Sequence, residues 1–174
     1  MKPIHIETER LTIRPHEAAD FDAYFAYIMD PELQADLGLH GVTDRSSCRE
    51  TYQWLRENTT FLALIPKDSG RTMGHIALHP PYERLAKDPA FQGKTGYSLS
   101  FAIARSERRK GLMSEALSAL VEELFAHRNA DYLDCEAEHG NLACCALQEK
   151  LGFIFWGTDR FDGTELIIQV LKNK

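Results

Sequence analysis

The stretch Arg108-Arg109-Lys110-Gly111-Leu112-Met113 decides the fold, because it connects a predicted apolar strand to a predicted amphipathic helix. Residues 97–103, just before it, are apolar enough to form a buried strand. After it, apolar side chains recur at the spacing of one helix face: Met113, Ala116, Leu117, Leu120, Val121, Leu124 and Phe125. A strand, a basic turn and a helix start predict an anion site, since the first-turn amides lack intrahelical partners and the helix dipole favours negative charge there.

Phosphate is the anion that this turn suits. Gly111 has no Cβ, so a phosphate can approach its backbone closely, and three cations stand beside it. The alternative is a solvated basic turn, but the flanking strand and helix favour the anion site. Other phosphate motifs do not fit: a P-loop needs Lys and then Ser or Thr after its last glycine, and a dinucleotide loop needs three glycines.

Three segments in the right order resemble the GNAT superfamily of N-acetyltransferases. Arg108-x-x-Gly111-x-Met113, followed by Ser114-Glu115-Ala116-Leu117, resembles the R/Q-x-x-G-x-G/A acetyl-CoA signature. The opening Ile6-Glu7-Thr8-Glu9-Arg10-Leu11-Thr12-Ile13-Arg14-Pro15 is similar to that of the ribosomal-protein N-terminal acetyltransferase branch (RimJ/RimL-like). Asn141 to Cys144, with Glu149-Lys150-Leu151-Gly152-Phe153, resembles the N-x-x-S…E-K-x-G-F of that branch. The resemblance covers nearly the whole chain.

The resemblance implies a mixed α/β (α+β) fold in one GNAT domain, residues 1–174. Such domains have a mostly antiparallel twisted sheet, flanked by helices, with central parallel strands that splay apart to admit the cofactor. The predicted order agrees: strand, helices, three strands, helix, strand, helix and two strands. The last two strands form a hairpin across Asp162-Gly163, a favoured hairpin dipeptide.

Local signals predict the individual elements. Residues 4–14 are predicted to form one strand, and Asp20 is predicted to cap the helix that follows. Ser46 or Ser47 is predicted to cap a later helix. Residues 80–95 form a long loop before the central strand, either functional or a tolerated insertion. The helix after Asn141 is predicted to turn four residues inward: Ala143, Ala146, Leu147 and Leu151.

Composition limits the possible partners. The chain has 174 residues, 44% of them hydrophobic and 26% charged, which is typical of a globular domain. Its net charge of −6 argues against general nucleic-acid binding. It has neither an apolar run long enough to span a membrane nor a signal-peptide pattern, so a cytoplasmic location is expected. Four cysteines without disulfide-framework spacing are expected to be reduced. The sequence leaves monomer or homodimer open.

The resemblance implies that acetyl-CoA is the acetyl donor. The cofactor-binding residues that it implies are Ile103, Arg108, Arg109, Lys110, Gly111, Leu112, Met113, Ser114 and Asn141. Backbone groups near Ile103 would pair with the pantetheine amides, and the turn would bind the pyrophosphate. Met113 departs from the family, which usually has Gly or Ala there. Its side chain would crowd the pyrophosphate unless it turns into the core, as its helical phase allows. Asn141 is equally well explained as a helix cap.

Cys144 and Glu136 are the predicted catalytic residues. By resemblance, Cys144 stands where this branch often has a Ser thought to protonate the leaving thiolate, and a thiol in the first turn of a helix can do the same; the alternative is simple packing. Asp134, Glu136 and Glu138 alternate on one strand face, and Glu136 is the candidate base. Glu165 is its competitor, and a base acting through water is also open.

The predicted function is acetyl transfer to a primary amine by direct attack in a ternary complex, with a protein N-terminus as the favoured acceptor. A small amine (polyamine, amino acid or amino-sugar antibiotic) and a non-catalytic CoA-binding sensor are the alternatives. His75 and His79 share a strand face, but they lack a third ligand at matching spacing, so no metal is expected.

Overall fold

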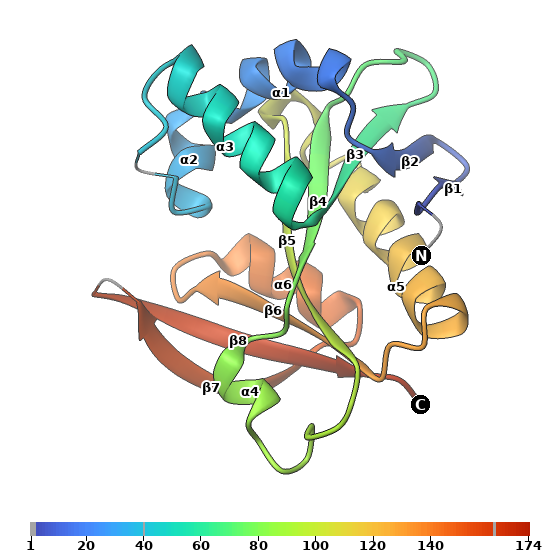
Figure 1. Cartoon of the computed structure of the whole chain (residues 1–174), viewed down its shortest axis with the longest axis vertical. Helices are drawn as coiled ribbons and strands as arrows, with labels where there is room; N and C mark the ends of the chain where they lie inside the picture. Colours follow the sequence, from blue (N-terminus) through green and yellow to red (C-terminus); the bar gives the residue numbers. More distant parts are fainter. Residues whose placement is uncertain (1–2, 40, 162) are drawn as a thin grey trace. The chain divides into compact units, whose positions relative to one another are not determined.

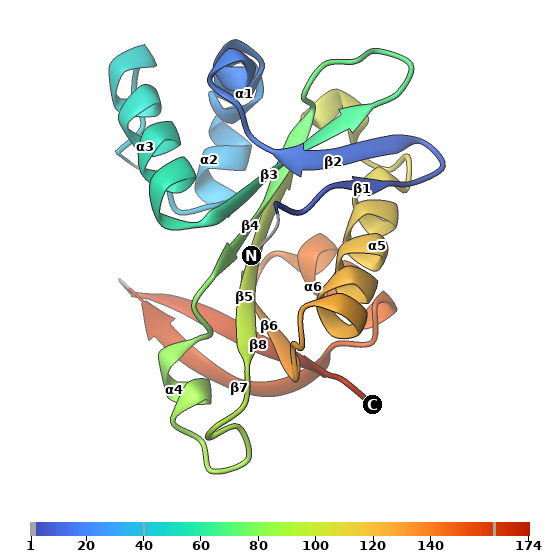
Figure 2. The same ribbon diagram turned by 45° about the vertical axis from the view of Figure 1, so that its right-hand side comes forward.

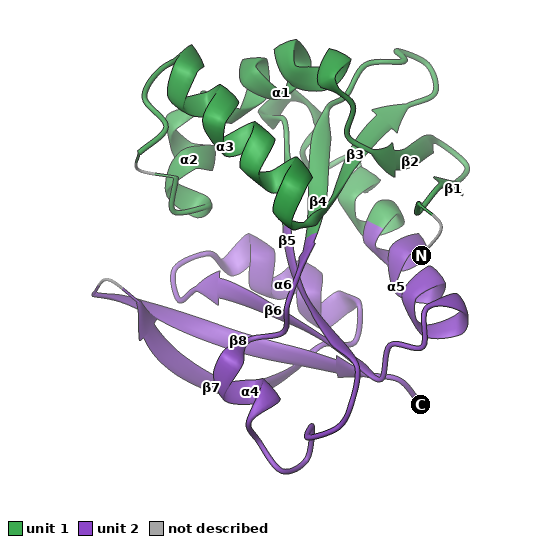
Figure 3. Ribbon diagram, in the orientation of Figure 1, with its two compact units in different colours: residues 1–77, 101–116 green, residues 78–100, 117–174 purple. Residues whose placement is uncertain are grey.

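The computed structural model describes residues 3–39, 41–161 and 163–174. The chain divides into two compact units, shown in Figure 3: residues 1–77 with 101–116, and residues 78–100 with 117–174. Eight strands are hydrogen-bonded in the order β1-β2-β3-β4-β5-β6-β8-β7, and Figure 1 follows them along the chain. β1–β2, β2–β3, β6–β8 and β7–β8 pair antiparallel and β5–β6 pair parallel, which confirms the predicted mixed α/β class.

The N-terminal segment of unit 1 is a hairpin and not the single strand predicted for residues 4–14. Ile6 pairs with Ile13 across a turn, in which the backbone N–H of Thr8 donates to the carbonyl of Leu11. The alternating pattern continued through the turn, so the break was not visible in the sequence. Three strands of this unit pair in succession: β1 (Ile6–Glu7), β2 (Leu11–Pro15) and β3 (Thr60–Pro66).

Helices α1, α2 and α3 of unit 1 lie side by side in both views (Figures 1 and 2). Their bounds, with the 3-10 turn before them, are η1 (Ala18–Asp20), α1 (Phe21–Ile28), α2 (Pro31–Asp36) and α3 (Arg45–Asn58). Asp20 occupies the predicted N-cap position of α1, but its side chain makes no bond to the amides of that helix, because it pairs with Arg14 and accepts from the Glu17 amide. The predicted cap of α3 at Ser46 or Ser47 is wrong. The cap of α3 is Asp44, whose carboxylate accepts from the amides of Ser46 and Ser47.

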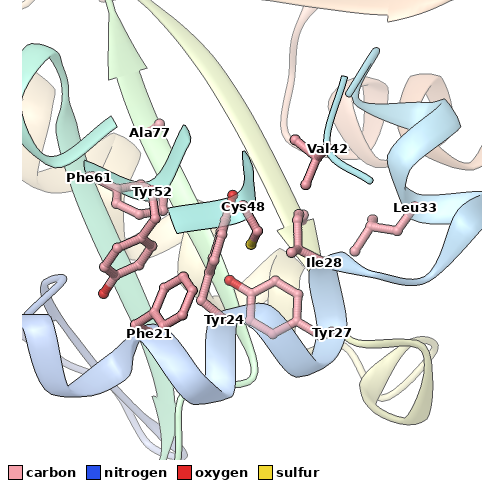
Figure 4. Close-up of a cluster of buried hydrophobic side chains, with 11 residues drawn as sticks. Phe21, Tyr24, Tyr27, Ile28, Leu33, Val42, Cys48, Tyr52, Phe61 and Ala77 are labelled. Atoms are coloured by element: carbon pink, nitrogen blue, oxygen red, sulfur yellow. The ribbon is translucent and has the colours of Figure 1, made fainter. Parts of the chain in front are cut away.

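The core of unit 1 is an aromatic cluster between these helices and the strands (Figure 4). Tyr24 and Tyr52 are almost fully buried, and their ring centroids are 4.9 Å apart. Burying several such rings stabilises the unit through apolar area and edge-to-face contacts. The buried members are Phe21, Tyr24, Tyr27, Ile28, Leu33, Val42, Cys48, Tyr52, Phe61, Ala77 and Ala102.

Unit 2 is built on the parallel pair β5 and β6. Their register runs from Gly96↔Tyr132 to Ser98↔Asp134, and no further pair between them is recorded in the described chain, although both strands continue. The two strands of this pair therefore separate where the family resemblance predicts splaying. Strands β4 (Gly74–His79) and β5 (Gly96–Ile103) contribute residues to both units. Unit 2 also contains β6 (Tyr132–Glu138), β7 (Ile154–Phe161) and β8 (Thr164–Lys172). The segment predicted to be a loop over residues 80–95 includes the short helix α4 (Glu83–Ala86), so that prediction is wrong at these residues.

The predicted closing hairpin is present as β7 and β8, paired from Ile154↔Val170 to Phe161↔Thr164. Asp162 lies outside the described residues. Helix α6 (Leu142–Lys150) ends as predicted, with Gly152 at φ +91° and the Phe153 amide bonded to the Gln148 carbonyl. Its predicted inward face is wrong at two positions, because Ala143 and Ala146 are exposed and Gln148 is buried.

The long helix α5 (Leu112–His127) follows the 3-10 turn η2 (Arg105–Glu107) and contributes residues to both units. Its predicted apolar face is confirmed, since Met113, Ala116, Leu117 and Leu120 are buried. None of the helices in the described ranges is long and apolar enough to cross a membrane.

Candidate active site

The turn from Arg108 to Leu112 presents backbone amides rather than side chains. Arg109 has φ +63° and Gly111 has φ +78°, so two residues adopt the left-handed backbone conformation just before α5 begins. A Cβ on Gly111 would meet only the Arg10 guanidinium, at an ordinary contact distance of 3.5 Å, so space alone does not require a glycine there. The positive φ does, because residues with a side chain rarely adopt it. In the described chain, no acceptor is recorded for the N–H groups of residues 109–114. Six successive unpaired donors at a helix start form a site for an anion.

Most cations of the turn are paired within unit 1. Arg108 lies 3.0 Å from Glu32 and 3.7 Å from Asp36 on α2, and Arg105 lies 3.3 Å from Glu32. Lys110 pairs with Glu107 at 2.9 Å. Arg109 is exposed and has no recorded partner among the described residues. The Arg108 side chain, predicted to meet the cofactor, is thus occupied by α2, while the amides and Arg109 remain available.

Glu115 connects the turn to the N-terminal hairpin. Its carboxylate accepts from the Thr8 hydroxyl at 2.5 Å, the Arg10 amide at 2.9 Å and Arg10 Nε at 2.6 Å. Burial alone would raise its pKa, but these bonds from Thr8 and Arg10 lower it. Arg10 also donates to the Lys110 carbonyl at 2.9 Å. Glu115 was missed as a site residue, although Thr8 and Arg10 lie in the opening that resembles the family.

The remaining predicted cofactor residues in unit 1 differ in exposure. Leu112 and Met113 are buried, so the Met113 side chain is in the core and leaves the turn uncrowded. Ser114 and Ile103 are half-buried. Whether these residues bind the cofactor stays a prediction.

Unit 1 also has a pocket of about 380 Å³ beside the turn. Its cations are paired: Lys67 lies 3.1 Å from Glu7, and Arg10 lies 2.6 Å from Glu115. The pocket therefore offers no unpaired cation for a phosphate. Its lining residues are Glu9, Arg10, Pro66, Lys67, Asp68, Glu107, Lys110 and Leu112.

Glu136 and Asp134 lie on one face of β6 in unit 2. Burial raises the pKa of Glu136, and the charge of Asp159 raises it further. Burial raises the pKa of Asp134 to about 7, because its side chain is completely enclosed. A half-buried carboxylate with a raised pKa is a suitable general base near neutral pH. Glu165, the competitor, is exposed on β8 opposite Arg160.

Tyr82 brings the segment before α4 to these carboxylates. Its backbone N–H donates to Asp134 at 3.3 Å, and its hydroxyl donates to Asp159. Burial and this bond to Asp159 raise the pKa of Tyr82 to about 12. This contact could not be predicted from the sequence, because Tyr82 and Asp159 are 77 residues apart and lie outside any motif.

Asn141 and Cys144 open helix α6. The Asn141 side chain caps the helix by accepting from the Cys144 amide at 3.0 Å, which is the structural alternative considered for it. Cys144 is half-buried, and its sulfur accepts from Gln148 Nε2 at 3.1 Å. The same amide nitrogen donates to the buried Cys135 sulfur at 3.0 Å. Cys135 and Gln148 are further polar neighbours of the site that sequence reasoning missed.

The two histidines on β4 have separate partners. His75 Nδ1 lies 2.9 Å from the Tyr27 hydroxyl, and His79 Nε2 lies 2.8 Å from the Ser100 hydroxyl. Over residues 3–39, 41–161 and 163–174, no group of three or more His, Cys, Asp or Glu side chains is placed to bind a metal ion.

Known proteins resemble this chain in sequence and in fold. The N-acetyltransferase p20 of Bacillus licheniformis is 25% identical over 151 residues, covering 84% of this chain and 80% of its own. A GNAT acetyltransferase from Bacillus anthracis superposes with a TM-score of 0.82 at 19% identity, covering 98% and 99% of the two chains. The ribosomal L7/L12 α-N-protein acetyltransferase RimL, in complex with coenzyme A, superposes with a TM-score of 0.78 at 14% identity. The match covers 97% of this chain and 98% of RimL. The acetyltransferase (GNAT) domain model matches residues 10–154, and the chain therefore belongs to the GNAT acetyltransferase family.

Proposed function

We propose that this protein transfers the acetyl group of acetyl-CoA to the α-amine of a protein N-terminus. The observation that carries the cofactor assignment is the run of unpaired amides from residue 109 to residue 114 at the start of α5. Acetyl-CoA presents a pyrophosphate, which such amides bind well. The acceptor is inferred from the fold that this chain shares with the α-N-protein acetyltransferase RimL.

The residues present suit the cofactor. The amides of 109–114 and the Arg109 guanidinium would hold its phosphates, while Met113 stays in the core. Acetyl-CoA supplies an activated acetyl thioester. Glu136 removes a proton from the attacking amine, and its raised pKa makes it a stronger base than an exposed glutamate. Cys144 is the proposed proton donor to the leaving thiolate; its own sulfur is held by the Gln148 amide.

Calorimetry tests the phosphate site. Gly111→Glu adds a side chain and a negative charge at φ +78°, and we expect acetyl-CoA binding to weaken about tenfold or more. Gly93→Glu is the matched control, since Gly93 has φ +75° and open space around it. The control should bind within about twofold of wild type. Equal affinity of folded Gly111→Glu and wild type would refute the site.

An acceptor screen by free-thiol release tests the function. Short peptides with free α-amines are compared with a polyamine, free amino acids and an amino-sugar antibiotic. Turnover of peptides alone supports the proposal. Turnover of a small amine would show that the acceptor is a small amine and not a protein N-terminus. Acetyl-CoA binding without any turnover would identify a non-catalytic sensor.

Substitutions at Cys144 test the proton donor. Cys144→Ala should lower kcat by roughly 10-fold to 10³-fold with acetyl-CoA affinity nearly unchanged, and Cys144→Ser should recover much of the loss because a hydroxyl also donates. The adjacent, half-buried Cys145 provides the control, Cys145→Ala. If Cys144→Ala turns over like wild type, the residue only packs.

A further inference from the structure

Asp134 is a carboxyl group enclosed in unit 2, and none of the described residues places a cation against it. It is 0% exposed, and in the β-sheet register it lies between Ser98 on β5 and Val170 on β8. The groups that act on it are the Ser98 hydroxyl, the Tyr82 backbone N–H and the nearby Glu136. A buried charge without a counter-ion destabilises a fold, and such groups are concentrated at functional sites.

Asp134 is attached to the segment that carries α4. The Tyr82 amide donates to both carboxylate oxygens, at 3.3 and 3.4 Å. The same segment also contacts β7: Arg84 lies 3.0 Å from both Asp159 and the Thr158 carbonyl, and Trp156 Nε1 lies 3.3 Å from Asp88. On β6 the segment meets Asp134, two residues from the proposed base Glu136, and its Leu85 packs in one buried cluster with Tyr132.

We propose that Asp134 is a positioning residue for the acceptor: its ionised carboxylate holds the Tyr82 amide and thereby fixes the 82–88 segment beside Glu136. This inference rests on the proposed function, because Glu136 is the base only under that function. The segment then forms a wall that orients the incoming amine, and the acceptor reacts best when Asp134 is charged. Ionisation strengthens the bond from Tyr82, since a charged acceptor binds an N–H more tightly than a neutral one.

The proposal predicts a pH dependence near neutrality. Burial, opposed by the bonds from Ser98 and Tyr82, raises the pKa of Asp134 to about 7, and the charge of Glu136 adds to the rise. Tyr132 on the same strand also interacts with Asp134: burial raises the pKa of that phenol, and the charge of Asp134 raises it further. Val170, opposite on β8, is apolar. Below pH 7 the carboxyl is therefore neutral, and the Tyr82 amide loses its charged acceptor.

The activity test compares Asp134→Asn with wild type on the peptide acceptor from the screen, at pH 6.0 and pH 8.5. At pH 8.5 we expect kcat/KM for the peptide to fall about tenfold in the variant, mainly through acceptor KM, while the KM for acetyl-CoA stays within about twofold. At pH 6.0 the difference in kcat/KM between variant and wild type should shrink below about threefold, because wild-type Asp134 is then protonated. Glu138→Gln, the same chemical change on the same strand face, should stay within about twofold at both pH values.

A second measurement needs no turnover. In wild type, the amide resonance of Tyr82 should titrate with a midpoint near pH 7, and Asp134→Asn should abolish this titration. A Tyr82 amide that does not titrate, or a variant-to-wild-type activity ratio that is equal at both pH values, would overturn the proposal. If Glu136→Gln turns over like wild type while Tyr82 titrates, the proposed base is wrong and the hold of Asp134 on Tyr82 is retained.

Discussion

Two buried aspartates, one in each unit, differ in whether a cation lies against them. Asp20 in unit 1 is 8% exposed and accepts two bonds from Arg14, at 2.7 and 3.0 Å, and one from Thr72 at 3.1 Å. Asp134 in unit 2 is 0% exposed and has no cation among the groups that shift its pKa. Burial would raise the pKa of Asp20, but Arg14 lowers it; burial raises that of Asp134 to about 7.

The difference separates a structural carboxylate from a functional candidate. Burial disfavours the charged form of both groups, and only a close counter-ion reverses that effect. Asp20 is therefore ionised at little cost and joins β2 to the start of α1. Asp134 is ionised at neutral pH only against its environment, which fits a group whose charge is needed for function rather than for stability.

Removing the counter-ion should have the largest effect. Arg14→Met keeps the apolar stem but leaves Asp20 buried and unpaired, so we expect the free energy of unfolding at pH 7 to fall by about 3–4 kcal/mol. In wild type the folded pKa of Asp20 is lowered, so its contribution is present above about pH 4 and is lost as pH falls through the folded pKa. The gap between variant and wild type should narrow in acid. Urea unfolding at pH 3.5 and pH 7 checks this; an equal loss at both pH values would indicate lost packing instead.

Asp134→Asn should change stability in the opposite sense. The folded pKa of about 7 lies above the usual 3.8, so wild-type stability is lost as pH rises through this range, by on the order of 4 kcal/mol. The asparagine variant cannot ionise and lacks that loss. Its free energy of unfolding should therefore fall less between pH 4 and pH 8 than that of wild type. Unfolding curves measured across this range test it, and identical pH slopes for the two proteins would contradict a raised pKa.

Ser98→Ala should sharpen the contrast by a smaller amount. The Ser98 hydroxyl stabilises the charged form of Asp134, so its removal should raise the pKa of that carboxyl by roughly one unit, about 1 kcal/mol. The carboxyl carbon resonance, followed by NMR against pH, measures the shift. Ser100→Ala on the same strand is the control, because the Ser100 hydroxyl lies against His79 instead. A matching shift in the control would show that the effect is not local.

An exposed pair should matter least. Asp22 pairs with Arg45 in unit 1, where the two side chains are 79% and 51% exposed. Water screens such pairs, so Asp22→Asn should change the free energy of unfolding by less than about 0.5 kcal/mol. Chemical unfolding of Asp22→Asn, measured in parallel with Arg14→Met, tests this prediction. A loss comparable to that of Arg14→Met would mean that burial does not decide how much an ion pair contributes to stability.

Elements with strong local signals were predictable from the sequence. The turn with Gly111, the apolar face of α5, and the end of α6 at Gly152 depend on backbone geometry and residue spacing, which are local properties. The predicted single strand over 4–14 failed because the alternating pattern does not show where a hairpin turns. The cap at Ser46 or Ser47 failed because the neighbouring Asp44 is also a suitable cap, and the Asp20 carboxylate is drawn from its helix by Arg14, a contact that spacing does not reveal.

By itself the sequence determined the family, the order of the elements except for the N-terminal hairpin and α4, and the glycine turn with its row of amides. Only the tertiary structure decided which charges are balanced. Arg108 is paired with Glu32, 76 residues away, and Tyr82 with Asp159, 77 residues away. The three carboxylates on β6 look alike in the sequence, but Asp134 is enclosed and Glu136 is half-buried. The physical reason is that propensity and spacing act over a few residues, whereas a pKa depends on burial and on charges that folding brings within a few ångströms.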